Sequence, residues 1–188
     1  MPRPIEFAIV PSSLGDLLIA ASEKGVCQVR FADPGVDMKE ELAREFPFAE
    51  LRENPIRLEP WSDALVSYVD GHSTRLEVPL DVSGSRFERR VWAALRGIPR
   101  GETRTYGEVA SSLGVAKGAR AVGRACASNP VALAIPCHQV VAKGDGLGGY
   151  RWGLARKRYL LEREAAGREE PASPLTHWRT DEKERGLG

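Results

Sequence analysis

The first thirty residues alternate between apolar and polar positions with the two-residue period of β-strands. Three such runs, 6–10, 14–22 and 25–31, are separated by the turn-forming segments PSSLG and SEKG. Short breaks of this kind join neighbouring antiparallel strands, so the pattern predicts two or three strands of one sheet. A further strand-like run, TRLEVPLDV, follows at 74–82.

Two helices are predicted between these strands. Residues 37–46 favour a helix because their apolar side chains recur at four-residue steps: Met38, Leu42 and Phe46. The second helix opens with Pro60 and closes at Gly71, since proline is favoured at the start of a helix and glycine just past its end.

The small residues SGS at 83–85 separate two predicted domains. Strands and helices mix before them, which predicts a small α/β domain over 1–85. After them the pattern changes to short helices, which predicts a mainly helical domain over 86–166 that ends in a helix at 154–166. The polar tail, 167–188, has the composition of a disordered segment.

The start of the helical domain carries strong local signals. Ser85 with Glu88, and Thr105 with Glu108, have the spacing of the capping box, in which two side chains satisfy each other's free backbone amides. A third helix, over 116–128, is rich in small residues and follows a tight glycine turn. A short helix, a turn and a second helix in this order predict a helix-turn-helix motif.

Charge is unevenly distributed along the chain. Residues 1–85 hold 8 Lys/Arg against 15 Asp/Glu, residues 86–130 hold 9 against 3, and the whole chain holds 27 against 26. The basic middle segment is either solvated surface or the contact for an anionic partner. No apolar run approaches the roughly 20 residues of a membrane span, and the start lacks a signal-peptide pattern, so we predict a cytoplasmic protein.

The segment IPCHQVV at 135–141 holds the main candidate for chemistry. A free cysteine is only a few per cent thiolate at neutral pH, so a nucleophilic Cys137 needs a nearby base, and His138 is the candidate. If the segment is extended, adjacent side chains point to opposite faces, and His138 reaches the thiol through a water. Glu164 lies four residues after Leu160 on the inward face of the last helix, where its carboxylate can orient the imidazole. The alternative is that Cys137 is only a small core residue.

Three stretches of the chain, RTYGEVA, GARAVGRACASNPVALAIPCHQVV and GYRWGLARKRYLLERE, resemble the methylated-DNA–protein-cysteine methyltransferases, also called O6-alkylguanine-DNA alkyltransferases. They are similar in particular to the methyltransferase part of the bacterial adaptive-response protein. The match is continuous from 87 to 165. Over 1–85 it is looser and implies the family's ribonuclease-H-like front domain. The resemblance implies a single-use DNA repair reaction that moves the alkyl group from O6-alkylguanine to Cys137, with O4-alkylthymine as a further candidate substrate.

The resemblance also implies roles for individual residues. Cys137 is the alkyl acceptor, His138 the water-linked base, Glu164 the carboxylate that orients His138, and Asn129 the residue that braces the active-site turn. The residues expected to contact DNA are Arg120, which enters the duplex, Tyr106, which pushes on a phosphate, and Arg124, a candidate phosphate contact. Those expected to form the base pocket are Tyr150, Val140 and Arg151, the last two through their backbone.

The implied partner is double-stranded DNA that carries O6-alkylguanine, bound by a monomer without cofactor or metal. The chain departs from the family at Gln139, where arginine is common after Pro-Cys-His. Cys27 and Cys126 are expected to be packed, since three scattered cysteines form neither a disulfide framework nor a zinc site. Three alternatives stay open: a binding-only relative, disfavoured because Cys137 is present, a thiol hydrolase, and a DNA-binding regulator.

Overall fold

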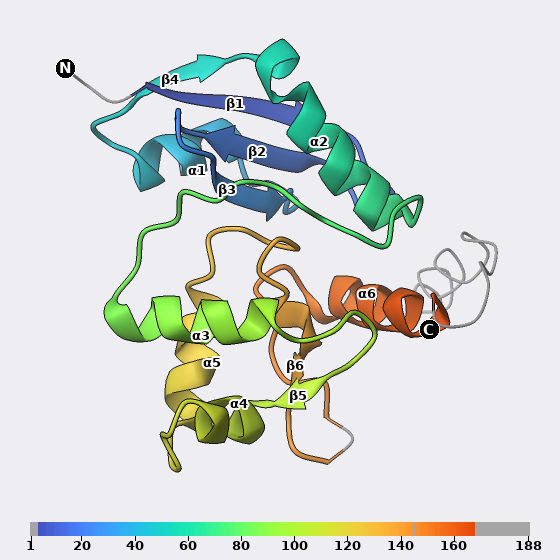
Figure 1. Cartoon of the computed structure of the whole chain (residues 1–188). Coiled ribbons are helices and arrows are strands. Elements are labelled where there is room, and N and C mark those ends of the chain that lie inside the picture. The colour runs from blue at the N-terminus through green and yellow to red at the C-terminus, as the bar shows by residue number, and fades with distance from the viewer. Residues whose placement is uncertain (1–3, 145, 168–188) are drawn as a thin grey trace, which may run out of the picture.

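The front domain is built on a four-stranded sheet (Figure 1). The computed structural model describes residues 4–144 and 146–167 of the chain. The sheet has the order β3-β2-β1-β4 and is formed by β1 (Pro4–Val10), β2 (Leu17–Ala21), β3 (Val26–Phe31) and β4 (Glu50–Glu53). β2 is antiparallel to both β1 and β3, which confirms the predicted hairpin strands, and β4 lies parallel to β1.

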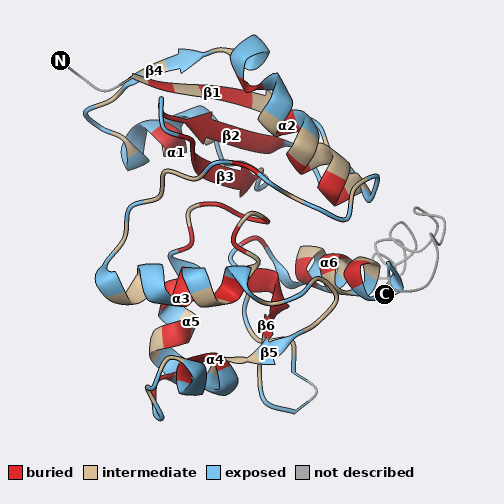
Figure 2. Cartoon of the chain, in the orientation of Figure 1, coloured by how far each residue is buried: buried red, intermediate tan, exposed pale blue. Residues whose placement is uncertain are grey.

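Different partners cover the two faces of this sheet. On one face, Phe7 and Leu18 pack with Leu42 of α1 (Met38–Glu45), the helix predicted at 37–46. The opposite face, which includes Ile19, packs against α2 (Pro55–Asp70) and the rear domain. Successive side chains of a strand point to opposite faces, so a strand apolar at every position has both faces covered. Figure 2 accordingly shows β2 and β3 buried along their whole length.

The start of α2 differs from the prediction. The helix begins at Pro55 rather than Pro60, because the Asn54 side chain accepts the backbone N–H of Arg57 at 3.2 Å and caps it. Pro60 is exposed inside the helix, where its missing N–H removes one backbone hydrogen bond. The predicted end is confirmed, since Gly71 follows the helix in the left-handed conformation at φ 76°.

The strand predicted at 74–82 is wrong. This segment runs alongside β3 but shares only an isolated bridge with it, through the Val26 N–H, which donates to the Pro79 carbonyl at 2.8 Å, and the Val26 carbonyl, which accepts from Asp81 at 2.9 Å. Pro79 has no N–H, so a continuous ladder cannot form there. The fourth strand is instead β4, whose sequence ELRE is too short and too charged to give a strand signal.

The rear domain is mainly helical. Its helices are α3 (Arg86–Arg96), α4 (Tyr106–Ser112), α5 (Ala119–Ala127) and α6 (Leu154–Ala166). Both predicted capping boxes are formed, one at each start of α3 and α4. The helices α4 and α5 form the helix-turn-helix (Figure 1), with α5 beginning three residues later than predicted. The α6 bounds match the prediction, and a short parallel pair, β5 (Arg104–Thr105) with β6 (Val140–Val141), was not predicted.

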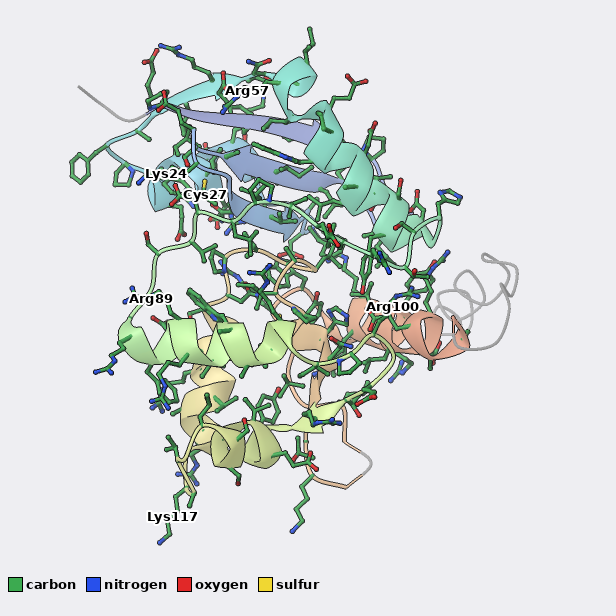
Figure 3. The ribbon with its side chains drawn as sticks, viewed as in Figure 1. Lys24, Cys27, Arg57, Arg89, Arg100 and Lys117 are labelled. Atoms are coloured by element: carbon green, nitrogen blue, oxygen red, sulfur yellow. The ribbon has the colours of Figure 1, made fainter. Side chains whose placement is uncertain are left out.

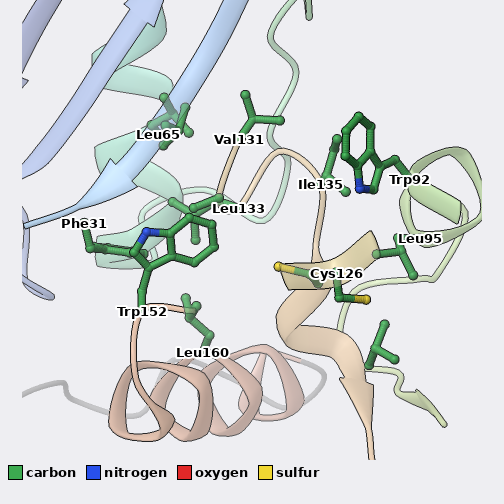
Figure 4. Close-up of a cluster of buried hydrophobic side chains, with 14 of the residues drawn as sticks. Phe31, Leu65, Trp92, Leu95, Cys126, Val131, Leu133, Ile135, Trp152 and Leu160 are labelled. Carbon is green, nitrogen blue, oxygen red and sulfur yellow. The ribbon is translucent and has the colours of Figure 1, made fainter. Parts of the chain in front are cut away.

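One continuous apolar core joins the two domains. Phe31 and Leu65 of the front domain pack with Leu133, Trp152 and Leu160 of the rear domain, as Figure 4 shows. Backbone hydrogen bonds reinforce the contact, since the N–H of Val29 on β3 donates to Pro130 at 2.9 Å and its carbonyl accepts from Ala132 at 3.0 Å. The segment that precedes Cys137 is therefore held on the edge of the front sheet.

The disordered tail predicted over 167–188 lies outside the described residues except for Gly167. Among the described helices, none is long and apolar enough to cross a membrane.

Candidate active site

Cys137 lies at the start of a single 3₁₀ turn, Cys137–Gln139, and is 4% exposed. Asn129 holds the chain ahead of this turn with both ends of its side-chain amide. Its Nδ2 donates to the Ile135 carbonyl at 2.9 Å and to Cys137 Sγ at 3.2 Å, and its Oδ1 accepts from the Val131 N–H at 3.0 Å. The structure thus brings together Asn129 and Cys137, two of the predicted site residues.

His138 is completely buried and its Nε2 lies 2.6 Å from Oε1 of Glu164 on α6. Glu164 faces inward, as its spacing from Leu160 predicted. In this arrangement Nε2 donates to the carboxylate and the lone pair is on Nδ1, which has no hydrogen-bond partner within the described residues. Nδ1 is therefore the atom of His138 that can accept a proton.

The local backbone differs from the expectation that 135–141 is extended. Residues of a 3₁₀ turn advance by about 120° each, so Cys137 and His138 diverge without pointing to opposite faces. In the described part of the chain no hydrogen bond joins Sγ to the imidazole. The expected indirect link between thiol and base stays a prediction.

Glu164 is held by a residue that the sequence did not single out. The hydroxyl of Tyr68 on α2 donates to the same Oε1 at 2.6 Å. Burial opposes ionisation of Glu164, but the His138 ring, the hydrogen bonds from His138 and Tyr68, and the charge of Arg100 outweigh it and lower the pKa of this carboxyl. Glu164 is therefore a carboxylate near neutral pH.

Lys157 was also missed, although it lies beside the candidate nucleophile. Its side chain is fully buried on α6, and Nζ donates to the carbonyls of Val140 at 2.6 Å and Gly149 at 3.0 Å. Burial lowers the pKa of Lys157. A helical lysine is normally read as solvated, so no local signal marked this one.

The thiol of Cys137 is protonated at rest. Burial raises its pKa to about 11, and the hydrogen bond from Asn129 and the charge of Lys157 only partly oppose this effect. Cys137 therefore has to lose its proton in the course of a reaction rather than before it.

A cavity of about 270 Å³ opens onto Cys137. Four separate segments line it: Tyr106, Gly123, Cys126, Ala127, Cys137, Gly149, Tyr150 and Arg151. A cavity of this size is at the lower edge of the range of small-molecule sites, about 300–1,000 Å³. A larger cavity of about 330 Å³, at Phe46 and Phe48 of the front domain, contains none of the predicted site residues.

The cavity gathers three of the residues predicted to handle the base or its phosphate. Tyr150 packs edge-on against His138, with ring centroids 6.4 Å apart, and against Trp152 at 5.3 Å. Tyr106, at the first position of α4, packs against Gly148, where a Cβ would lie 2.8 Å from its ring. Arg151 is exposed at the cavity.

Other predicted residues lie elsewhere. Val140 is not among the lining residues, and its carbonyl is taken by Lys157. Arg120 and Arg124 are exposed on α5, which also supplies part of the cavity wall. Cys126 is buried as expected, yet it also lines the cavity.

Gln139 stands where the family commonly has arginine, and its amide has a clear structural use. Its Nε2 donates to the carbonyls of Pro99 at 2.9 Å and Glu102 at 3.1 Å. These bonds attach the 3₁₀ turn to the chain between α3 and β5. A neutral amide therefore anchors this turn in the present chain.

The fold and the site together define a protein class: a helix-turn-helix protein with a buried thiol that faces a cavity and is backed by a His–Glu pair. Sequence comparison is more specific. Residues 5–82 match the ribonuclease-like domain of 6-O-methylguanine DNA methyltransferase, and residues 86–166 match its DNA-binding domain. The chain belongs to the 6-O-methylguanine DNA methyltransferase family.

Individual relatives agree with this assignment. The chain is 40% identical, over 90% of its own length and 96% of the relative, to the methylated-DNA–protein-cysteine methyltransferase of Mycolicibacterium paratuberculosis. It is also 40% identical over 88% of its length to the bifunctional transcriptional activator/DNA repair enzyme Ada of Escherichia coli, of which it covers 47%. The chain thus spans about half the length of the Ada proteins that it matches.

Solved structures share the fold. The O6-methylguanine methyltransferase of Mycobacterium tuberculosis superposes with a TM-score of 0.76 at 34% identity, covering 90% of this chain and 96% of that one. A structure of the M. tuberculosis protein in complex with DNA has a TM-score of 0.74 at 35% identity, covering 86% and 93%. The resemblance to the family, and the ribonuclease-like and helical domains that it implied, are confirmed.

Proposed function

We propose that this chain repairs DNA by transferring the alkyl group of O6-alkylguanine to Cys137, once per protein molecule. The observation that carries the proposal is the position of Cys137 at the wall of a base-sized cavity, with the His138–Glu164 pair behind it. The names of the relatives, which act on methylated DNA through a cysteine, support the same reaction.

The proposed chemistry follows from the protonation states. The Cys137 sulfur attacks the alkyl carbon while its proton passes to Nδ1 of His138, directly or through water. A carbon–sulfur bond forms as the carbon–O6 bond breaks, and the electron pair stays on the guanine, which takes up a proton. Burial raises the pKa of Tyr150, so its phenol keeps its proton and can donate a hydrogen bond to the base.

The product explains the single use. A thioether at Cys137 is a stable bond, and the cavity offers a second thiol, Cys126, as another nucleophile. Burial raises the pKa of Cys126 to about 12, so this thiol is a poor nucleophile for removing the alkyl group. Cys137 therefore ends the reaction alkylated.

Access to the base requires that it leaves the double helix. Flipping a nucleotide costs a few kcal/mol, which an inserted side chain can partly offset. Arg120 is exposed near the start of α5, and α5 also supplies Gly123 and Ala127 to the cavity. We assign Arg120 to the gap in the duplex, Tyr106 to the phosphate beside the flipped base, and Arg124 to a backbone phosphate.

The proposed base pocket keeps the predicted residues, but the contact through Val140 changes. Tyr150 and the Arg151 backbone remain the proposed contacts of the base. Val140 contributes through its carbonyl only if that oxygen keeps a free lone pair beside its bond from Lys157. We also propose that the protein acts as a cytoplasmic monomer with domains at 1–85 and 86–166, and that O4-alkylthymine is a secondary substrate.

The function is tested by incubating the protein with a duplex that contains O6-methylguanine and mapping the added methyl by peptide mass spectrometry. The proposal requires at most one methyl per protein, located on the peptide that contains Cys137. Cys137→Ser is the matched control and should accept none. Repeated turnover of small esters without methyl transfer would instead identify a thiol hydrolase, and binding without transfer would identify a binding-only relative.

A further inference from the structure

A hydroxyl from the front domain reaches into the buried pair of the rear domain. Tyr68 is 7% exposed and lies near the end of α2, which faces α6 in Figure 1. Its hydroxyl and Nε2 of His138 both lie 2.6 Å from one oxygen, Oε1 of Glu164. One side chain from each domain therefore contacts the same carboxylate oxygen.

The other carboxylate oxygen adds nothing to this anchoring. Oε2 of Glu164 is buried and has no hydrogen-bond partner within the described residues. Apart from His138 itself, Tyr68 is thus the side chain that holds the carboxylate in place in the described structure. Without the hydroxyl, the orientation of Glu164 would depend on the same imidazole that it is meant to orient.

Charge around the pair is balanced by the same group of residues. The guanidinium of Arg100 lies 5.3 Å from the centre of the Tyr68 ring, and Figure 3 shows Arg100 beside α6. Four side chains act on Glu164 from the elements packed against it: Tyr68, Arg100, His138 and Tyr150. The interactions with His138, the hydrogen bond from Tyr68 and, to a smaller extent, the charge of Arg100 lower the pKa of Glu164, so this buried carboxyl is held as a carboxylate.

We propose that Tyr68 is a positioning residue for the transfer reaction, and that its hydroxyl holds Glu164 so that His138 presents Nδ1 to the thiol. The proposal rests on the function proposed above and extends it, because it makes the front domain part of the proton-accepting apparatus. Burial and the neighbouring Glu164 raise the pKa of Tyr68, so its hydroxyl remains a donor throughout the pH range of the assay.

The test is the Tyr68→Phe variant, which removes one oxygen and keeps the ring. Hydrogen bonds to charged groups are the stronger ones, so we expect the single-turnover rate on the methylated duplex to fall on the order of tenfold. The carboxylate that has lost a donor also stabilises a protonated His138 more strongly. The acid limb of the rate–pH profile should therefore move to higher pH.

Two further variants separate positioning from a general loss of structure. Tyr159→Phe removes a hydroxyl that accepts from Arg163 on α6 at 2.6 Å, and it should leave the pH profile unchanged. In a Glu164→Gln background, Tyr68→Phe should have little additional effect, because the two residues act through one hydrogen bond.

The outcomes are distinguishable. If wild type transfers no methyl to Cys137, the proposed function itself is wrong. If wild type transfers methyl and Tyr68→Phe has the same rate and pH profile, Tyr68 has no positioning role. The same conclusion follows if the double variant loses as much transfer rate as the Tyr68→Phe and Glu164→Gln losses combined. A lower rate with an unshifted profile and a lowered melting temperature would also overturn it, as a purely structural effect.

Discussion

Replacing Asn129 by alanine should both destabilise the protein and slow methyl transfer to the Cys137 thiol. The side chain makes three hydrogen bonds in the interior, to Ile135, Val131 and Cys137. At about 1 kcal/mol for each bond the loss is about 3 kcal/mol, and the buried Val131 N–H left without its partner adds a further cost. For a chain of this size that lowers the melting temperature by about 6–12 °C.

The aspartate variant separates the two effects. Asn129→Asp keeps an oxygen for the Val131 N–H but replaces the Nδ2 donor with a second acceptor, which faces the Ile135 carbonyl and Sγ. A negative charge next to the sulfur raises the thiol pKa further. We therefore expect methyl transfer to be slower in Asn129→Asp than in Asn129→Ala at equal fractions of folded protein.

The assays are thermal or urea unfolding and single-turnover transfer to Cys137. Ser128→Ala is the matched control, since the neighbouring exposed hydroxyl donates to Glu88 at 2.6 Å, and it should cost less than about 1 kcal/mol. The reasoning is refuted if Asn129→Ala unfolds within 2 °C of wild type, on the scale of about 2–4 °C per kcal/mol. It is also refuted if the aspartate variant transfers methyl faster than the alanine variant.

Two other predictions concern DNA and pH. Arg120→Ala should slow repair in a duplex about tenfold or more but leave transfer from free benzylguanine unchanged, because only the duplex has a gap to fill; equal losses in the two assays would remove Arg120 from that role. At alkaline pH the thiols of Cys126 and Cys137 should destabilise the fold, since burial raises their pKa values from 9.0 to about 12 and about 11. Their contribution to stability is complete below pH 9 and is lost as the pH rises through 11. Between pH 8 and pH 10, the free energy of unfolding measured in urea should therefore fall by roughly 2–3 kcal/mol more in wild type than in a variant with alanine at both positions. Equal falls in the two proteins would contradict this prediction.

The parts of the fold that sequence could predict are those decided by neighbouring residues. The two capping boxes and the three alternating strands predicted at 6–10, 14–22 and 25–31 depend on contacts within a few positions, and all of these formed. The inward orientation of Glu164 could also be predicted, because the helical period that buries Leu160 determines which glutamate of α6 faces inward. Such signals survive because tertiary packing agrees with them.

The features that the sequence-based prediction missed or got wrong depend on contacts between distant segments. Tyr68 and Glu164 are 96 positions apart, and nothing near Tyr68 indicates which helix its hydroxyl meets. The burial of Lys157 depends on two carbonyls that converge on it from other segments. The run at 74–82 has strand composition, but Pro79 and its position at the edge of β3 limit it to a single bridge.

A protonated thiol at Cys137 suits the single-use reaction proposed for this chain. An exposed thiolate would react with oxidants and with any small alkylating agent, and each such event would consume a molecule without repairing DNA. Burial keeps Cys137 in the thiol form, and in the proposed reaction its proton leaves toward Nδ1 of His138, which is itself buried. In the reaction proposed above, the nucleophile forms when a flipped base occupies the cavity and brings an alkyl carbon to the sulfur. On this proposal, selectivity comes from the delayed ionisation of Cys137 as well as from the shape of the pocket, and through Tyr68 the proton-accepting pair depends on residues of both domains.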